Sequence, residues 1–184
     1  QRLQLFNLQE KLLIQNKWLV ADFWNSAMIS KGCISCGKPD GYFYINWDGN
    51  IMPCVFVPHY KDNIIKLYQE GKKLEDALIS DLFIKGREWQ TAYERNKDKP
   101  GNLLSPCFYR DHYADFIKIA TETNAMPENE EAKQAINSQE YYNDMINFDK
   151  QITTITQPIW DNILNQKYYI NESKSNTIKN YSQS

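Results

Sequence analysis

The chain has 184 residues, with 21 basic and 23 acidic side chains and a net charge of −2. This length suffices for one domain with a real core, or one compact unit with appendages. The even mixture of charges excludes the one-sided basic face of a nucleic-acid binder, and no apolar run approaches the roughly 18 residues of a membrane helix.

The first segment, residues 2–16, places Leu5, Leu8 and Leu12 at i, i+3 and i+7, which predicts an amphipathic helix. Residues 17–24 are rich in aromatic and β-branched side chains and predict a strand. Glycines and a proline loosen residues 25–40, so we expect a loop there. The start carries no signal-peptide pattern and no initiator Met, and we expect a cytoplasmic piece of a longer polypeptide.

The clearest local signal is a hairpin over residues 41–56. Two strand-forming runs flank Asp48-Gly49, and glycine accepts the positive φ of a tight turn without steric cost. Pro53 removes a ladder donor from the second run, which predicts an edge or a bulge at that point. The aromatic side chains of the first run are expected to pack across the strands.

Helical patterns dominate the rest of the chain. Residues 74–83 predict a short helix with Leu74, Ala77 and Leu78 inward, and the mixed charges of residues 85–99 predict a solvated face. A helix is predicted around Phe116, and another from residue 130 to about 165, with a break or kink at Pro158. A near-heptad seam on this last helix is expected to pack in the core; it comprises Tyr141, Met145, Phe148, Ile152 and Ile155.

The four cysteines have the spacing Cys33-x2-Cys36-x17-Cys54-x52-Cys107. Thiolates are soft ligands that suit zinc or iron–sulfur clusters, so we favour a metal site over free thiols and over disulfides. Only the first pair is close, unlike the paired knuckles of zinc ribbons. His59 and His112 each follow a cysteine by five residues and are alternative ligands. No catalytic constellation of Ser, His, Asp or Cys stands out, so no catalytic residue is assigned.

These residues resemble a known family. The chain resembles the SPASM or twitch domain of radical S-adenosylmethionine (SAM) enzymes in five features. These are Cys33 followed by Gly49-x4-Cys54, the hairpin segment 45–54, the Asp-Asn-Ile sequence at 62–64, the short helix predicted at 74–83, and the segment that ends in Cys107. The resemblance covers about residues 18–112. The Cys-x3-Cys-x2-Cys motif, which in that family binds the SAM-cleaving cluster, does not occur in this chain.

The resemblance implies an α+β fold: a small β-hairpin domain that binds an auxiliary cluster, packed with several helices and continued by a helical C-terminal extension. Residues 1–17 would be the terminal helix of a preceding barrel, 18–112 the cluster-binding domain, 113–170 the helical extension and 171–184 a flexible tail. The implied cofactor is one [4Fe-4S] cluster held by Cys33, Cys54 and Cys107. Cys36 stands where relatives usually have a small residue, and its role as fourth ligand is inferred from proximity.

The implied function is electron transfer or substrate anchoring beside a radical SAM barrel of the same polypeptide. That barrel would bind S-adenosylmethionine, and the substrate would be a peptide or a small molecule; Tyr42, Phe56 and Tyr60 are candidates to line its side of the site. Neither nucleic acid nor a membrane is an expected partner. The alternative is a zinc-stabilised, non-catalytic structural or interaction module, and a third possibility is a helical domain whose thiols only fill its core.

Overall fold

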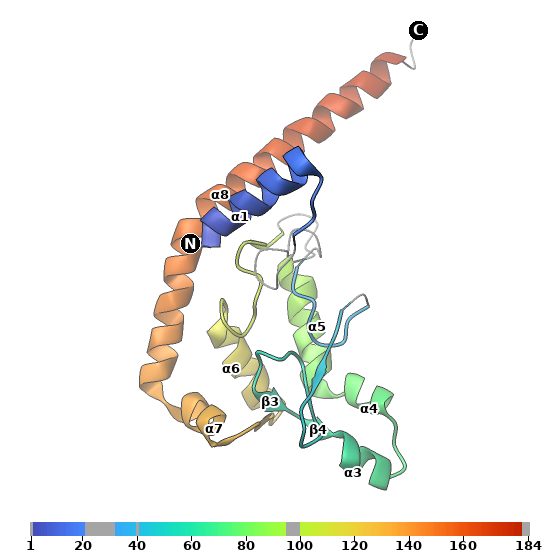
Figure 1. Ribbon diagram of the computed structural model, residues 1–184, viewed down its shortest axis with the longest axis vertical. Helices are drawn as coiled ribbons and strands as arrows, with labels where there is room; N and C mark the ends of the chain where they lie inside the picture. Colours follow the sequence, from blue (N-terminus) through green and yellow to red (C-terminus); the bar gives the residue numbers. More distant parts are fainter. Residues whose placement is uncertain (1, 21–31, 40, 95–99, 182–184) are drawn as a thin grey trace.

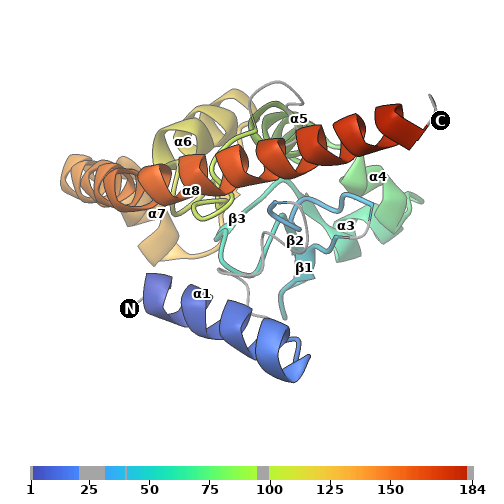
Figure 2. The same cartoon turned by 90° about the horizontal axis from the view of Figure 1, so that it is seen from above.

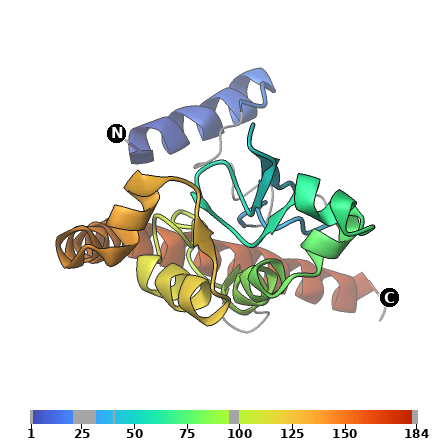
Figure 3. The ribbon, with the colours of Figure 1, turned by 90° about the horizontal axis from the view of Figure 1, so that it is seen from below.

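The computed structural model describes residues 2–20, 32–39, 41–94 and 100–181, and it has the α+β composition expected from the sequence. Small antiparallel sheets lie between α1 (Arg2–Lys11) on one side and α5 (Asp81–Glu94) and α6 (Tyr113–Glu122) on the other (Figures 2 and 3). The long helix α8 (Gln139–Tyr181) runs along one flank of this body and then extends beyond it (Figure 1). Within the described ranges, no helix combines the length and the apolar character that crossing a membrane requires.

The predicted hairpin is confirmed as β1 (Tyr44–Ile45) and β2 (Asn50–Met52), with Ile45 opposite Ile51. Gly49 has φ +82°, and its N–H donates to the Asn46 carbonyl, which closes the turn. The Asn46 side chain stabilises the same turn because its Oδ1 accepts from the N–H groups of Asp48 and Asn50.

A third strand, β4 (Asp62–Asn63), pairs with β2, so β2 is the central strand of the sheet. The expected edge at Pro53 agrees with the register, because Met52 pairs with β1 alone, whereas Ile51 pairs on both sides. The proline lies one residue beyond β2 and ends it, because it cannot donate the next ladder bond. The second sheet pairs β3 (His59–Tyr60) with β5 (Met126–Pro127), which lies between the helix around Phe116 and the helix from residue 130.

Short helices follow the first sheet. Asn63 caps α3 (Ile64–Gln69) by accepting from the N–H groups of Ile65 and Lys66, and its Nδ2 donates back to the Asp48 carbonyl. The helix α4 (Leu74–Leu78) buries Ala77 and half-buries Leu74 and Leu78, as predicted, but residues 81–83 of the predicted helix belong to α5 instead. These contacts join the hairpin turn to the helices that follow it.

The N-terminal segment departs from its prediction. A π-helical turn, η1 (Leu12–Asn16), follows α1, and Phe6 is the buried residue while Leu5 and Leu8 are 43% and 49% exposed. Apolar side chains occur around most of this helix, so periodicity alone did not identify the inward face. Residues 17–20 are not a strand, since Lys17 has φ +60° and Trp18 is exposed. The rest of that predicted strand, and residues 25–31 and 40 of the predicted loop, lie outside the described residues.

The C-terminal helices form as α7 (Glu130–Asn137) and α8, separated at Ser138. Tyr141 and Met145 pack on the core as the seam predicted, but Phe148 and Ile155 are 38% and 54% exposed. Pro158 lies inside α8 without ending it, and Figure 1 shows the helix changing direction part-way along its length. The backbone of α8 remains helical as far as Tyr181, across most of the segment predicted to be a flexible tail.

Two apolar clusters hold the fold together. The larger one joins the hairpin, α3 to α6 and the start of α8, around Ile51, Leu82, Phe83, Phe108 and Phe116. The smaller one joins Phe6 of α1, Leu104 of the segment before Cys107, and Trp160 of α8. All four cysteines lie on segments that pack against the larger cluster or connect the two.

Candidate thiol centre

Backbone hydrogen bonds join the Cys33–Cys36 segment to the two ends of the hairpin. The Tyr42 N–H donates to the Ile34 carbonyl at 2.8 Å, and the Cys36 N–H donates to the Pro53 carbonyl at 2.9 Å. The second bond places Cys36 beside the residue that precedes Cys54. These bonds hold the segment that carries Cys33 and Cys36 against the hairpin that carries Cys54.

Hydroxyl groups and one backbone N–H lie within hydrogen-bond distance of the sulfur atoms of these three residues. The Ser35 hydroxyl lies 3.2 Å from the Cys33 sulfur and 3.4 Å from the Cys36 sulfur. The Tyr42 hydroxyl lies 2.7 Å from the Cys54 sulfur, which also accepts from the Phe56 N–H at 3.5 Å. Once a cysteine loses its proton, these groups can only donate to its sulfur and so stabilise the thiolate, which is the form that binds metals.

The fourth cysteine is held by a tight turn after Pro106. The Asp111 N–H donates to the Cys107 carbonyl, and the Asp111 carboxylate accepts from the Cys107 N–H at 3.2 Å. Arg110 forms a bidentate ion pair with this fully buried carboxylate, and its own N–H donates to the Cys107 sulfur at 3.4 Å. Asp111 therefore fixes the backbone that presents Cys107.

All four cysteine thiols have raised pKa values. Burial raises the pKa of Cys33 and of Cys54, and it raises the pKa of Cys36 and of Cys107 to about 12. Neighbouring sulfurs contribute further: Cys54 raises the pKa of Cys33, and Cys33 raises that of both Cys36 and Cys107. All four cysteines are free, and their raised pKa values favour the protonated thiol at neutral pH.

Cys36 differs from the other three in its surroundings. It has φ +61°, is fully buried and belongs to the larger apolar cluster. Its sulfur lies against Gly86 of α5, where an added Cβ would come within 2.5 Å of it. Its side chain thus packs on α5, whereas Cys33 retains partial exposure.

The face of α5 that meets this segment contradicts the prediction of a solvated charged helix. Gly86, Gln90 and Glu94 occur at i, i+4 and i+8 and are all buried. Gln90 donates to the hydroxyl and carbonyl oxygens of Ser35, and the Glu94 carboxylate accepts the Cys33 N–H. The spacing of these three residues could have indicated a buried face, because residues at i, i+4 and i+8 lie on the same side of a helix and a glycine there allows close packing.

An ion pair is buried at the edge of the centre. The Nζ of Lys38 lies 4.0 Å from Glu94, and both side chains are nearly inaccessible to solvent. Gly32, at φ +111°, leaves room for the Glu94 carboxylate, which a side chain at that position would meet. Charges buried in this way need partners, and Lys38 and the Cys33 N–H supply them to Glu94.

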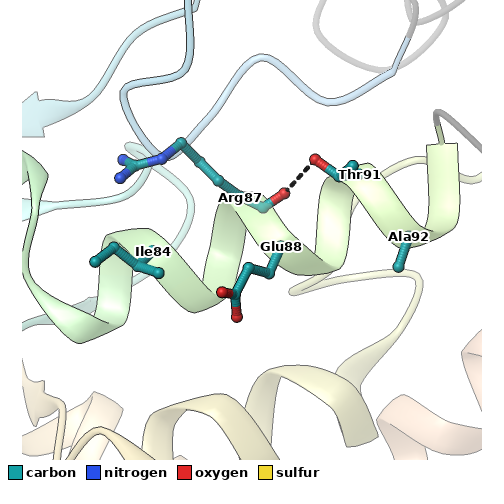
Figure 4. Close-up of a pocket in the computed structure, with 5 residues that line it drawn as sticks. All are labelled: Ile84, Arg87, Glu88, Thr91 and Ala92. Atoms are coloured by element: carbon teal, nitrogen blue, oxygen red, sulfur yellow. Dashed lines mark hydrogen bonds between the residues drawn. The ribbon is translucent and has the colours of Figure 1, made fainter.

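The outer side of α5 carries an open hollow of about 390 Å³, lined by Ile84, Arg87, Glu88, Thr91 and Ala92 (Figure 4). Arg87 leaves this side to donate to the Cys36 carbonyl at 2.9 Å, while Glu88 points in the other direction (Figure 4). Arg87 therefore both lines the hollow and binds the segment that carries Cys33 and Cys36.

The two histidines occupy different surroundings. His59 is 1% exposed and packs against Phe116, and burial lowers its pKa to about 4. His112 packs against the stacked rings of Trp89 and Tyr93, with its Nε2 2.9 Å from the Ser105 carbonyl oxygen. Of the aromatic side chains predicted to line a substrate, Tyr42 contacts Cys54 and Phe56 is 39% exposed.

In the described part of the chain, no three His, Cys, Asp or Glu side chains are placed so that they could hold a metal ion as they stand. The chemistry of the donor set nevertheless suits a soft metal, because all four residues are cysteines and each sulfur has a hydroxyl or N–H group within hydrogen-bond distance. A cysteine has a single rotatable bond before its sulfur, so joint ligation would require rotation of side chains and movement of the segments that carry them.

Comparison of the chain with protein-family models, with curated proteins and with solved structures gives no match in any of the three.

Proposed function

We propose that the thiol centre binds a [4Fe-4S] cluster through Cys33, Cys54 and Cys107, with Cys36 as the neighbouring fourth thiol. The observation that carries the proposal is that the Ser35 hydroxyl lies within 3.4 Å of the Cys33 and Cys36 sulfurs, while the Cys36 N–H binds the carbonyl of Pro53, the residue before Cys54. All four cysteines are free, and burial raises the pKa of each. Proteins that bind iron–sulfur clusters hold them by cysteine thiolates in such buried sets.

The surroundings of the sulfurs support this function. Amide donors at Cys54 and Cys107 and the hydroxyls of Ser35 and Tyr42 would stabilise the negative charge of a cluster and tune its reduction potential. Each coordinating thiol must lose its proton, so cluster binding releases protons from groups that are neutral beforehand. The affinity for the cluster should therefore increase with pH, because the thiols lose their protons more easily.

Together with the family resemblance, the thiol centre supports a role as the auxiliary-cluster domain of a radical SAM enzyme, for electron transfer or for anchoring a peptide or small-molecule substrate. The barrel of the same polypeptide would bind S-adenosylmethionine. The exposed apolar side chains of α1 and η1, among them Leu8 and Ile14, are compatible with a contact to such a barrel.

Anaerobic reconstitution of the whole chain with iron and sulfide tests the proposal. We expect about four irons and four sulfides per chain, with the broad absorption of a [4Fe-4S] cluster. Cys54→Ser and Cys107→Ser should each abolish uptake. Val55→Ser, a substitution at an exposed residue next to Cys54, serves as the matched control and should retain it.

Two results would contradict the proposal in different ways. Uptake of one tightly held zinc per chain without iron and sulfide would identify the zinc-stabilised structural module. If Cys54→Ser changes neither metal content nor stability, the thiols are core residues and no metal function remains.

A further inference from the structure

The buried stripe of α5 makes separate contacts with the Cys33–Cys36 segment. Gly86 accommodates the Cys36 sulfur, Gln90 binds Ser35, and Glu94 binds the Cys33 N–H. Of these three, only Gln90 reaches a side chain that itself contacts two sulfurs. This makes Gln90 the point at which α5 can influence the thiols without touching them.

The geometry of Gln90 determines the direction of these hydrogen bonds. Its Nε2 donates to the Ser35 hydroxyl oxygen at 2.9 Å and to the Ser35 carbonyl oxygen at 3.3 Å. An amide nitrogen can only donate, so the Ser35 oxygen accepts and its own hydrogen remains for another partner. The two nearest side-chain partners are the sulfurs of Cys33 at 3.2 Å and Cys36 at 3.4 Å.

A metal-bound thiolate can only accept hydrogen bonds, so the Ser35 O–H would donate to sulfur in the loaded centre. We propose that Gln90 is a positioning residue of the thiol centre, which fixes the Ser35 hydroxyl so that its hydrogen points at the cysteine sulfurs. This inference rests on the proposed metal function and adds to it a residue 55 positions away from Ser35 in sequence. Groups of this kind orient ligands and tune the metal that the ligands hold.

The test uses the whole chain with two probes: cobalt(II), whose sulfur-to-cobalt charge-transfer band reports affinity, and the reconstituted cluster, whose reduction potential is measured by spectroelectrochemical titration. Gln90→Leu and Ser35→Ala should each weaken cobalt binding by about tenfold or more. Each should also shift the cluster potential to more negative values, because loss of a hydrogen bond to sulfur disfavours the reduced, more negative cluster.

The variants are compared as a cycle. The double variant Gln90→Leu/Ser35→Ala should be no weaker than Ser35→Ala alone, because Gln90 acts through Ser35. Ser35→Thr keeps a hydroxyl and should restore the wild-type potential. Gln134→Leu makes the same change at an exposed position on α7 and should alter neither cobalt affinity nor potential.

The melting temperature of each metal-free variant shows whether the fold is retained. If Gln90→Leu melts early, Gln90→Met, which keeps the side-chain length but has no donor, replaces it and should give the same shift. An unchanged potential in Gln90 variants, or additive effects in the double variant, would overturn the positioning role. If the wild-type chain binds neither cobalt nor cluster, it is the proposed function that fails.

Discussion

At the scale of single residues, His59 illustrates how burial without hydrogen bonding changes a titration. Neither ring nitrogen has a hydrogen-bond partner within the described part of the chain, and the imidazole packs on Phe116. The only cause of its lowered pKa, about 4 against an ordinary 6.5, is the loss of hydration. The folded chain therefore keeps His59 neutral where the unfolded chain protonates it.

This difference predicts a loss of stability as the pH falls from about 6.5 toward about 4. The unfolded state gains the proton first, so the free energy of unfolding should decrease by up to about 3 kcal/mol over that window. His59→Leu removes the group without breaking a hydrogen bond, and it should flatten the difference in urea-unfolding free energy between pH 7 and pH 5. A pH-dependent loss as large as that of the wild type would show that other groups cause it.

A second prediction at this scale concerns the contact between Gly86 and Cys36. A methyl group at residue 86 would come within 2.5 Å of the Cys36 sulfur and 3.4 Å of its Cβ. Gly86→Ala gains about 1 kcal/mol of helix propensity but overpacks the core by about 1–3 kcal/mol. We expect a net loss of stability of about 1 kcal/mol in denaturant unfolding of the metal-free chain.

The double variant Gly86→Ala/Cys36→Ala checks the cause of that loss. Removing the sulfur creates the space that the new methyl group needs, so the double variant should be at least as stable as Cys36→Ala alone. If the two substitutions destabilise the chain independently, the sulfur does not lie against Gly86.

At the scale of elements, sequence patterns predicted those parts whose signal is local. The hairpin followed from Asp48-Gly49, and α4 followed from Leu74, Ala77 and Leu78. The buried face of α5 could not be predicted in the same way. Its polar residues are buried only because Ser35 and Cys33, more than 50 residues earlier in the chain, supply their hydrogen-bond partners.

The same limit explains α1 and gives a prediction. Its apolar residues surround the helix, and only the contact with Leu104 and Trp160 selects Phe6 as the inward one. Phe6→Ala should therefore cost about 3 kcal/mol of unfolding free energy, whereas Leu8→Ala should cost less than about 0.5 kcal/mol. Denaturant unfolding measures both, and equal effects would mean that α1 is not docked through Phe6.

At the scale of the whole molecule, the four cysteines were predicted as one set, and the structure shows which elements carry them. The hairpin places Cys33, Cys36 and Cys54 together, and the segment between the two apolar clusters presents Cys107. That segment is fixed to α8, since Asn102 donates to Thr156 at 2.9 Å and the Trp160 indole N–H donates to the Pro100 carbonyl at 3.4 Å. Nothing in the sequence around Cys107 specifies these distant partners.

Because the smaller cluster is separate from the larger one, the two should differ in local stability. Trp160 is 2% exposed, and its truncation to Ala removes most of the smaller cluster, at a cost of about 3–5 kcal/mol. We expect faster amide hydrogen exchange in α1 and in residues 102–105, with exchange in β1, β2 and β4 unchanged. Ile155→Ala, at a position of α8 that is 54% exposed, should leave both regions as they are. Faster exchange throughout the chain in Trp160→Ala would show instead that the clusters unfold as one unit, and that the thiol centre depends directly on α8.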